Sequence, residues 1–232
     1  MSETSTHSKV ELAATGRLLS LGFAPPSDET LAEIDALADA LVHTSPGPEL
    51  FAVGRALRMH HPDSHATQYA RLFRGTVRVA PYEGSYELDP IRQGRQMADV
   101  AAFYRAFGAE AHGPHAERPD FVGCELEFLS FLELRRLTAI EAREDGVDVI
   151  EGIRDAFLAD HAGRWLPTFF AEVAREAPAG SLYAALAELG TRTLADELER
   201  RGVEPAPLPA RSRAAAVEAD TFECGTAAVP SR

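Results

Sequence analysis

Cysteine is scarce in this sequence, which contains only Cys124 and Cys224 among its 232 residues. Cys124 falls in an apolar segment and Cys224 in a C-terminal stretch without periodicity, so the two do not predict a disulfide framework. No stretch approaches the roughly 20 apolar residues of a membrane-spanning helix, and the polar N-terminus lacks the pattern of a secretory signal. These absences favour a reducing, cytoplasmic setting.

Basic residues are also fewer than acidic ones. The chain has 23 Lys and Arg against 36 Asp and Glu, which gives a formal net charge of -13. This balance argues against nucleic acid as the main partner, because phosphate binding calls for a basic face. It is compatible with a basic protein or peptide partner, although solubility alone is the commoner reason for an acidic composition.

Motifs for catalysis are missing as well: there is no G-x-S-x-G elbow, Walker loop or dinucleotide fingerprint. The His60–His65 cluster leaves open a metal-dependent hydrolase that uses His61, Asp63 and His65. Pro62 marks a helix start between the two histidines, so the simpler interpretation is a solvated N-terminus capped by Asp63. We therefore expect no enzyme, no metal and no cofactor.

Strand patterns are too weak to compete with helical spacing, so the predicted class is all-α. Residues 1–201 predict one helical bundle domain, and residues 202–232, rich in alanine and proline, predict a disordered tail. Residues 74–93 predict an extended functional loop, with a short strand as the alternative. Apolar residues at helical spacing predict helices over residues 9–23, 31–41, 50–59, 62–73, 97–107, 120–143, 149–158, 165–173 and 182–198.

The helix predicted from Asp120 to about Arg143 is apolar on nearly every side. Such a helix must be wrapped by other helices or lie in a membrane, and Glu125, Glu127 and Glu133 argue against a membrane. We predict a buried central helix with Asp120 as its N-cap. A buried Glu125 needs a partner: an arginine of another helix is the structural candidate, and a cation on a ligand is the functional one.

Six segments carry a family resemblance through their order and spacing. They are residues 69–73 (YARLF), 81–86 (PYEGSY), 98–108 (ADVAAFYRAFG), 117–120 (ERPD), 125–129 (ELEFL) and 160–169 (DHAGRWLPTF). Together they resemble the TorD/DmsD-type redox enzyme maturation chaperones, which are related to the nitrate reductase delta subunits and the NarJ-type chaperones. The resemblance spans about residues 10–200.

The resemblance implies an all-helical, non-catalytic chaperone. Such proteins bind the catalytic subunit of a molybdenum oxidoreductase of the dimethyl sulfoxide reductase family while bis(molybdopterin guanine dinucleotide) is inserted. For exported clients they also bind the twin-arginine signal peptide. The acidic net charge suits a peptide that joins an arginine pair to an apolar run.

The resemblance also implies a set of peptide-binding residues. Phe121 stands where many family members have histidine, so a role that needs a titratable imidazole is not expected at that position. Asp120 or Glu83 is expected near the arginine pair of the peptide. The implied peptide-binding residues are Tyr69, Leu72, Phe73, Pro81, Tyr82, Glu83, Asp120 and Phe121.

Besides the hydrolase, a permanent structural subunit of a membrane-bound complex remains an alternative. The sequence leaves open whether the protein is a monomer or a homodimer, and whether a guanine nucleotide binds. It does not name the client enzyme or say whether that client is exported.

Overall fold

The computed structural model describes residues 3–44, 46–109 and 117–209, with side chains from residue 10 onward. Across these residues it has helices and no β-strand, which confirms the predicted all-α class. A 3₁₀ turn, η1 (Glu83–Tyr86), and a π-helical turn, η2 (Leu158–Ala162), interrupt the series. The α-helices are α1 (Glu3–Phe23), α2 (Asp28–Leu41), α3 (Gly47–Met59), α4 (Pro62–Phe73), α5 (Pro90–Ala106), α6 (Val122–Ala142), α7 (Val147–Phe157), α8 (Gly163–Glu176) and α9 (Leu182–Arg201).

Start signals in the sequence place several of these helices. The hydroxyl of Ser27 accepts from the Thr30 amide at the start of α2, and Ser181 caps α9 in the same way. Asp89 caps α5 ahead of Pro90, so α5 begins earlier than predicted and takes up the end of the predicted 74–93 loop. The rest of that loop holds η1 and one isolated antiparallel bridge, between Tyr82 and Phe121.

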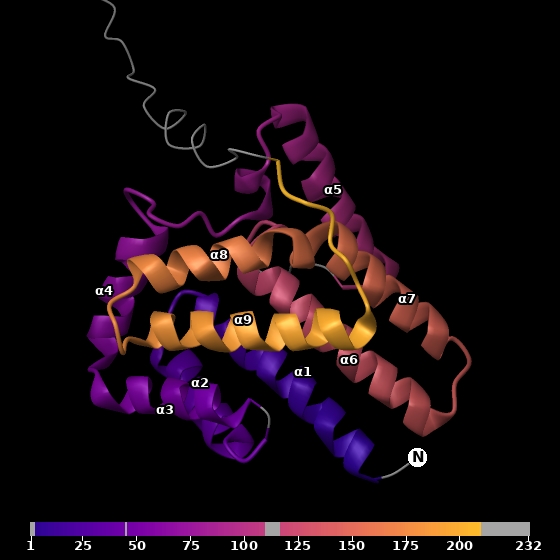
Figure 1. Cartoon of the computed structure of the whole chain (residues 1–232), viewed down its shortest axis with the longest axis horizontal. Helices are drawn as coiled ribbons and strands as arrows, with labels where there is room; N and C mark the ends of the chain where they lie inside the picture. Colours follow the sequence, from indigo (N-terminus) through magenta and orange to yellow (C-terminus); the bar gives the residue numbers. More distant parts are fainter. Residues whose placement is uncertain (1–2, 45, 110–116, 210–232) are drawn as a thin grey trace, which may run out of the picture.

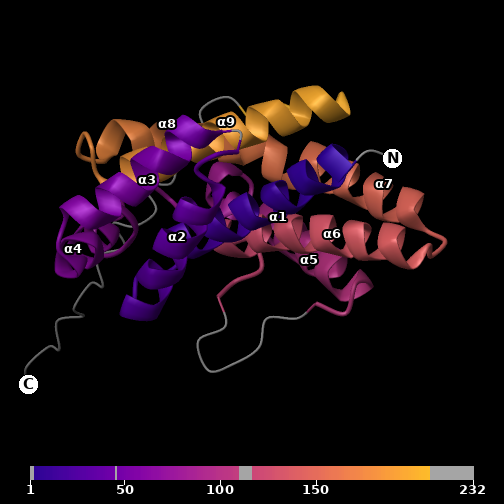
Figure 2. The ribbon, with the colours of Figure 1, turned by 90° about the horizontal axis from the view of Figure 1, so that it is seen from below.

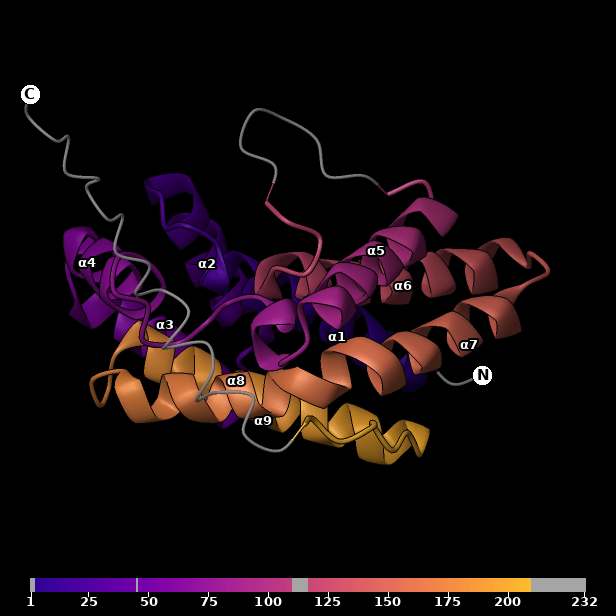
Figure 3. The ribbon, with the colours of Figure 1, turned by 90° about the horizontal axis from the view of Figure 1, so that it is seen from above.

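Two helices far apart in sequence form the centre of the molecule. Helices α1 and α6 lie side by side in Figure 2, and the hydroxyl of Ser130 donates to the Ala13 carbonyl between them. Gly16 allows this approach, because a Cβ on it would lie 3.2 Å from the Cβ of Ser130. The α8–α9 hairpin crosses in front of them in Figure 1, while α2, α3 and α4 lie on one side and α5 and α7 on the other (Figure 3). Helix α6 therefore has the central position that the sequence predicts.

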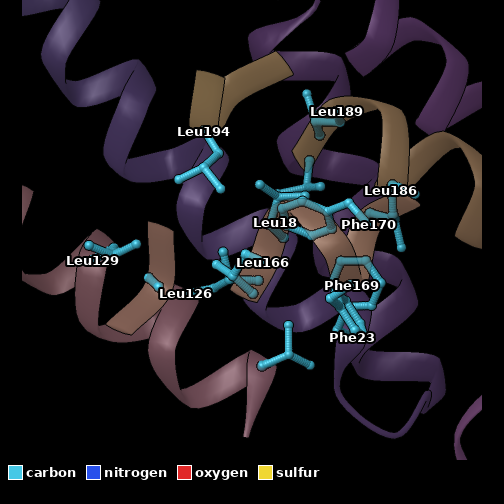
Figure 4. Close-up of a cluster of buried hydrophobic side chains, with 14 of the residues drawn as sticks. Leu18, Phe23, Leu126, Leu129, Leu166, Phe169, Phe170, Leu186, Leu189 and Leu194 are labelled. Carbon is cyan, nitrogen blue, oxygen red and sulfur yellow. The ribbon is translucent and has the colours of Figure 1, made fainter. Parts of the chain in front are cut away.

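The core lies where α1, α6, α8 and α9 meet (Figure 4). Aromatic rings join these helices: Phe23 of α1 packs edge-on against Phe169 of α8, with ring centroids 5.1 Å apart. Gly190 of α9 admits the ring of Phe170, which lies 2.6 Å from where a Cβ would stand. The labelled core residues are Leu18, Phe23, Leu126, Leu129, Leu166, Phe169, Phe170, Leu186, Leu189 and Leu194.

The segment after α9 differs from the prediction of a disordered tail as far as residue 209. Val203 and Leu208 pack against the core, and the Ala206 amide donates to the Ala159 carbonyl. Pro205 approaches Gly163, where a Cβ would be 2.7 Å from its ring. Residues 210–232 of the predicted tail, like residues 110–116 of a predicted loop, lie outside the described residues.

Candidate functional site

Two loops that carry most of the predicted site cross each other at the start of α6. We call this contact of residues 81–86 with residues 117–122 the crossing. Its bridge is framed by two backbone hydrogen bonds: the Glu83 amide donates to the Asp120 carbonyl and the Val122 amide to the Pro81 carbonyl, each at 2.9 Å. The crossing thus brings together Pro81, Tyr82, Glu83, Asp120 and Phe121, five of the eight residues implied for peptide binding.

Asp120 holds the crossing together rather than capping the central helix. Its carboxylate is fully buried and accepts two bonds from Arg118, at 2.9 and 2.7 Å, and one from the Gly84 amide at 3.1 Å. Helix α6 begins at Val122 with Phe121 at its N-cap, where no side chain caps it. The prediction of Asp120 as N-cap was therefore wrong, because the paired arginine and the amide of the neighbouring loop occupy its oxygens.

A strip of aromatic and charged side chains reaches the surface beside the crossing. The hydroxyl of Tyr82 donates to Glu117 at 3.1 Å, and Arg74 pairs with the other oxygen of Glu117 at 3.3 Å. The guanidinium of Arg118 lies over the Tyr82 ring, 4.7 Å from its centroid, and that of Arg74 lies near Tyr69. Burial, followed by the Glu117 carboxylate, raises the pKa of Tyr82. The phenol therefore stays protonated and acts as a hydrogen-bond donor.

Seven of the eight predicted site residues are buried. Tyr82 alone is partly exposed. Phe73 packs in the core against Phe169 and Tyr183, with ring centroids 6.0 and 5.7 Å away, and Leu72 is almost fully covered. These residues touch a peptide only if the surrounding helices separate, so their peptide-binding role stays a prediction.

Glu125 is buried beneath the crossing, and its partner is not the predicted arginine. One carboxylate oxygen accepts from the indole of Trp165 at 2.9 Å, and the other has no hydrogen-bond partner among the residues that the structure describes. Burial first, and then the nearby Glu83 carboxylate, raises the pKa of Glu125 well above its usual value. A protonated Glu125 avoids the cost of a buried, half-satisfied charge.

The π-helical turn η2 supplies a second polar contact under the crossing. Nδ1 of His161 lies 3.0 Å from Glu83, and Nε2 lies 3.3 Å from Asp99 of α5. Because His161 and Glu83 are both buried, this contact ties the η1 loop to α8 through the protein interior. Helix α5 is joined to the crossing by Tyr104, whose hydroxyl donates to the Pro119 carbonyl at 2.8 Å.

An apolar groove opens beside the crossing, between α1, the end of α5 and α6. Its cavity volume is about 710 Å³. Val10 and Leu134 stand half-exposed at its edge, and Tyr104 connects it to the crossing. We call it the α1–α5–α6 groove. Its apolar lining includes Val10, Ala13, Ala14, Leu37, Tyr104, Ala109, Cys124, Phe128, Phe131 and Leu134.

The apolar residues of α6 that line this groove are visible in the sequence, but they predicted contacts with other helices. Helix α6 is apolar all round, and we expected other helices to wrap it. Part of that apolar surface, including Cys124, Phe131 and Leu134, instead lines an open groove. Cys124 is a free thiol whose pKa is raised to about 12, by burial first and then by Glu127 and other carboxylates. Such a thiol is inert at neutral pH, as the sequence predicts.

A set of three charged residues marks the rim of the groove. Arg17 of α1 donates to Glu127 of α6 at 2.8 Å and to Glu33 of α2 at 3.2 Å. All three side chains are at least 39% exposed, so the pairs contribute little to stability. The rim therefore offers carboxylates next to an apolar lining.

The histidine cluster of the hydrolase alternative is not assembled as a metal site. His61 and Asp63 are exposed and 3.4 Å apart, whereas His65 is buried against other groups. The N-cap of α4 is His61, whose ring accepts from the Asp63 amide, so the predicted Asp63 cap was wrong. Among the described residues, no group of three His, Cys, Asp or Glu side chains is placed to hold a metal ion.

None of the helices in the described ranges has the length and apolar character needed to cross a membrane.

Comparisons with known proteins point in one direction. A family model described as nitrate reductase delta subunit matches residues 24–171, more than half of the chain. The selenate reductase assembly chaperone protein of Thauera selenatis is 35% identical over 95 residues, which cover 41% of this chain and 48% of that protein. The chlorate reductase assembly chaperone protein of Ideonella dechloratans is 32% identical over 105 residues, which cover 44% and 53%. The chain thus spans about half the length of these curated relatives.

A solved structure shares the fold. The crystal structure of a candidate redox enzyme maturation protein from Archaeoglobus fulgidus superposes with a TM-score of 0.53 at 22% sequence identity. The match covers 79% of this chain and 93% of that one. At this identity, the likeness supports the helical architecture and says nothing by itself about a ligand.

Proposed function

Because the chain belongs to the nitrate reductase delta subunit family, we propose that it is a chaperone for the assembly of a molybdenum-dependent reductase. The observation that carries this proposal is that family membership, together with two relatives that are named assembly chaperones of reductases. Its partner is the catalytic subunit of the client before the subunit is complete. The chaperone acts in the cytoplasm and catalyses no reaction.

The α1–α5–α6 groove is the site that we assign to the client's N-terminal peptide. Its volume of about 710 Å³ lies in the usual range of ligand sites, and its lining is mainly apolar. An apolar segment of the peptide docks on Phe131, Leu134 and Val10, in the manner of a helix in a groove. The net charge of -13 favours a peptide that also carries arginines, such as a twin-arginine signal.

Peptide capture serves the timing of assembly. A chaperone that occupies the N-terminal peptide delays assembly or export while the molybdenum cofactor, bis(molybdopterin guanine dinucleotide), enters the catalytic subunit. The crossing supports this role indirectly, since it fixes the start of α6 and the position of Tyr104 on the groove wall. In this proposal the client binds the cofactor.

Affinity capture from native cytoplasm tests the function. The full chain, tagged and expressed at its natural level, should co-purify with a molybdenum reductase catalytic subunit that lacks its cofactor. The mature reductase purified from the same cells should contain none of this chain. Capture of no reductase subunit, or presence of the chain as a stoichiometric subunit of the mature complex, would overturn the proposal; the second result favours the structural-subunit alternative.

Calorimetry with the N-terminal peptide of the captured client tests the site. Leu134→Glu places a charge on the groove edge and should weaken binding about tenfold or more, because it opposes the docking of an apolar run. Val149→Glu is the matched control, since Val149 is 62% exposed on α7, away from the groove. Equal loss in both variants would reject the groove as the site.

A further inference from the structure

The rim of the groove already binds a guanidinium group. Arg17 projects from α1 and its side chain is held by two carboxylates that come from different helices, Glu33 of α2 and Glu127 of α6. The two contacts use different nitrogens of the same guanidinium, Nε at 3.2 Å and Nη1 at 2.8 Å. This arrangement shows that the spacing of Glu33 and Glu127 suits an arginine side chain.

The ion pairs of Arg17 are also weak enough to exchange. The three side chains are 39%, 43% and 58% exposed, so water competes for each of them. Arg17 and Glu127 both line the α1–α5–α6 groove, and Leu37 lines it one helical turn after Glu33. A peptide that lies in the groove therefore brings its own side chains within reach of the same two carboxylates.

We propose that Glu33 and Glu127 form a guanidinium clamp for the client peptide, which Arg17 fills in the free protein and an arginine of the peptide takes over on binding. This inference rests on the proposed function, because it needs a peptide in the groove. Exchange conserves the number of ion pairs, so the apolar contacts supply the affinity and the clamp supplies selection for arginine. Arg17 thus keeps the clamp from remaining as two unpaired carboxylates when no client is bound.

The chain contains a matched control in Arg58. Its guanidinium is likewise shared by two carboxylates, Asp39 at 2.6 Å and Asp35 at 3.3 Å. Both of these lie on α2, and Arg58 lines a different hollow, between α2 and α3. Substitutions at Arg58 change the net charge of the protein by the same amount as those at Arg17 but leave the groove intact.

The probe is a synthetic peptide with two adjacent arginines ahead of a leucine–alanine run of about 12 residues, and its twin has citrulline in place of arginine. Against the arginine peptide, Arg17→Gln should bind about two- to fivefold more tightly than Arg58→Gln at low ionic strength, since the clamp is then unoccupied. The pair Glu33→Gln and Glu127→Gln should bind about two- to fivefold more weakly than Asp35→Asn and Asp39→Asn. Both differences should shrink at high salt and vanish with the citrulline peptide.

Two results would overturn the clamp while the proposed function stands. One is a normal affinity of the wild-type chain with no gain for Arg17→Gln over Arg58→Gln. The other is a gain of the same size with the citrulline peptide. Failure of the wild-type chain to bind either probe or the client's own peptide would instead reject peptide capture, and the clamp with it.

Discussion

The crossing and the α1–α5–α6 groove adjoin at Tyr104, but they use their side chains in opposite ways. At the crossing, the carboxylate of Asp120 and the ring of Phe121 are buried, and Asp120 is bonded to partners within the chain. In the groove, Leu134 and Val10 remain about half-exposed with a cavity beside them. The buried side chains of the crossing are packed within the chain, whereas the groove leaves apolar surface uncovered.

This difference distinguishes side chains that are fixed by partners within the chain from apolar side chains that are free to contact another protein. Residues 81–86 and 117–120, two of the segments that carry the resemblance, build the crossing, where Glu83 and Asp120 are buried. A surface that receives a client needs unoccupied apolar area, and the groove provides it on the adjacent face of α6. Tyr104 and Phe128, from two other such segments, line the wall of the groove, whereas its half-exposed edge, Val10 and Leu134, lies outside the segments that carry the resemblance.

The largest loss of folding stability should follow from Phe73→Ala. This substitution tests whether Phe73, an implied peptide contact, is instead a core residue. Phe73 packs against Phe23, Phe169 and Tyr183, so its removal leaves a cavity. We expect a loss of about 3–5 kcal/mol in the free energy of unfolding, measured by urea denaturation. Phe51→Ala, at a site 61% exposed on α3, should cost far less.

A stable Phe73→Ala variant that has lost only peptide affinity would contradict this comparison. It would mean that Phe73 contacts the client after a rearrangement that the buried state conceals. Binding therefore has to be measured on the folded fraction, with far-UV circular dichroism recorded on the same sample.

Asp120→Ala should have the next largest effect. The substitution removes the buried acceptor of Arg118 and leaves the Gly84 amide without its partner. Because Arg118 is half-exposed and can return to water, we expect about 2–4 kcal/mol of destabilisation, less than for a fully buried pair. Asp120→Asn should recover part of the lost stability. The control Asp63→Ala, at an exposed position, should change stability by less than about 0.5 kcal/mol.

Local sequence signals predicted most of the helices. Periodic apolar residues and polar caps such as Ser27 and Ser181 act within a few positions of the chain, so they are visible in the sequence. The first turns of α5 were missed because residues 90–96 have no apolar periodicity: this part of the helix is held by the Asp89 cap and faces solvent. The sequence therefore predicts that a helix exists and where its apolar part lies, but it does not predict a helix start that faces solvent.

The candidate site was harder to predict because its contacts are tertiary. An arginine of another helix was the structural candidate for the partner of Glu125 and a ligand cation the functional one, but the residue that reaches it is Trp165, 40 positions later. Asp120 has the residue type of an N-cap, yet Arg118 and the Gly84 amide occupy its oxygens. The groove is open because no other helix of the described residues covers that part of α6. The periodicity of apolar residues predicts which face is apolar, but it does not predict whether another helix covers that face.

Glu125→Gln should change the pH dependence of stability. The folded state raises the pKa of Glu125 above its unfolded value near 4.5, so folding favours the protonated acid. Stability of the wild type should therefore fall as pH rises through the window between the unfolded and folded pKa values, by at most about 1.4 kcal/mol per pH unit, and level off above the folded pKa. Glutamine mimics the protonated acid and still accepts from Trp165, so the variant should lack this fall and be the more stable protein at neutral pH. If the stability of the two proteins changed in parallel between pH 4 and 8, the folded state would not raise the pKa of Glu125.

The smallest effect on folding should come from the groove itself. Leu134→Gln replaces a side chain that is 50% exposed at the groove edge, so we expect the free energy of unfolding to change by less than about 0.5 kcal/mol. Val10→Gln should behave alike, because the same groove leaves it half-exposed. Chemical denaturation measures both. A loss above about 1.5 kcal/mol would show that the edge of the groove is packed like the crossing, and the contrast between the two regions would then fail.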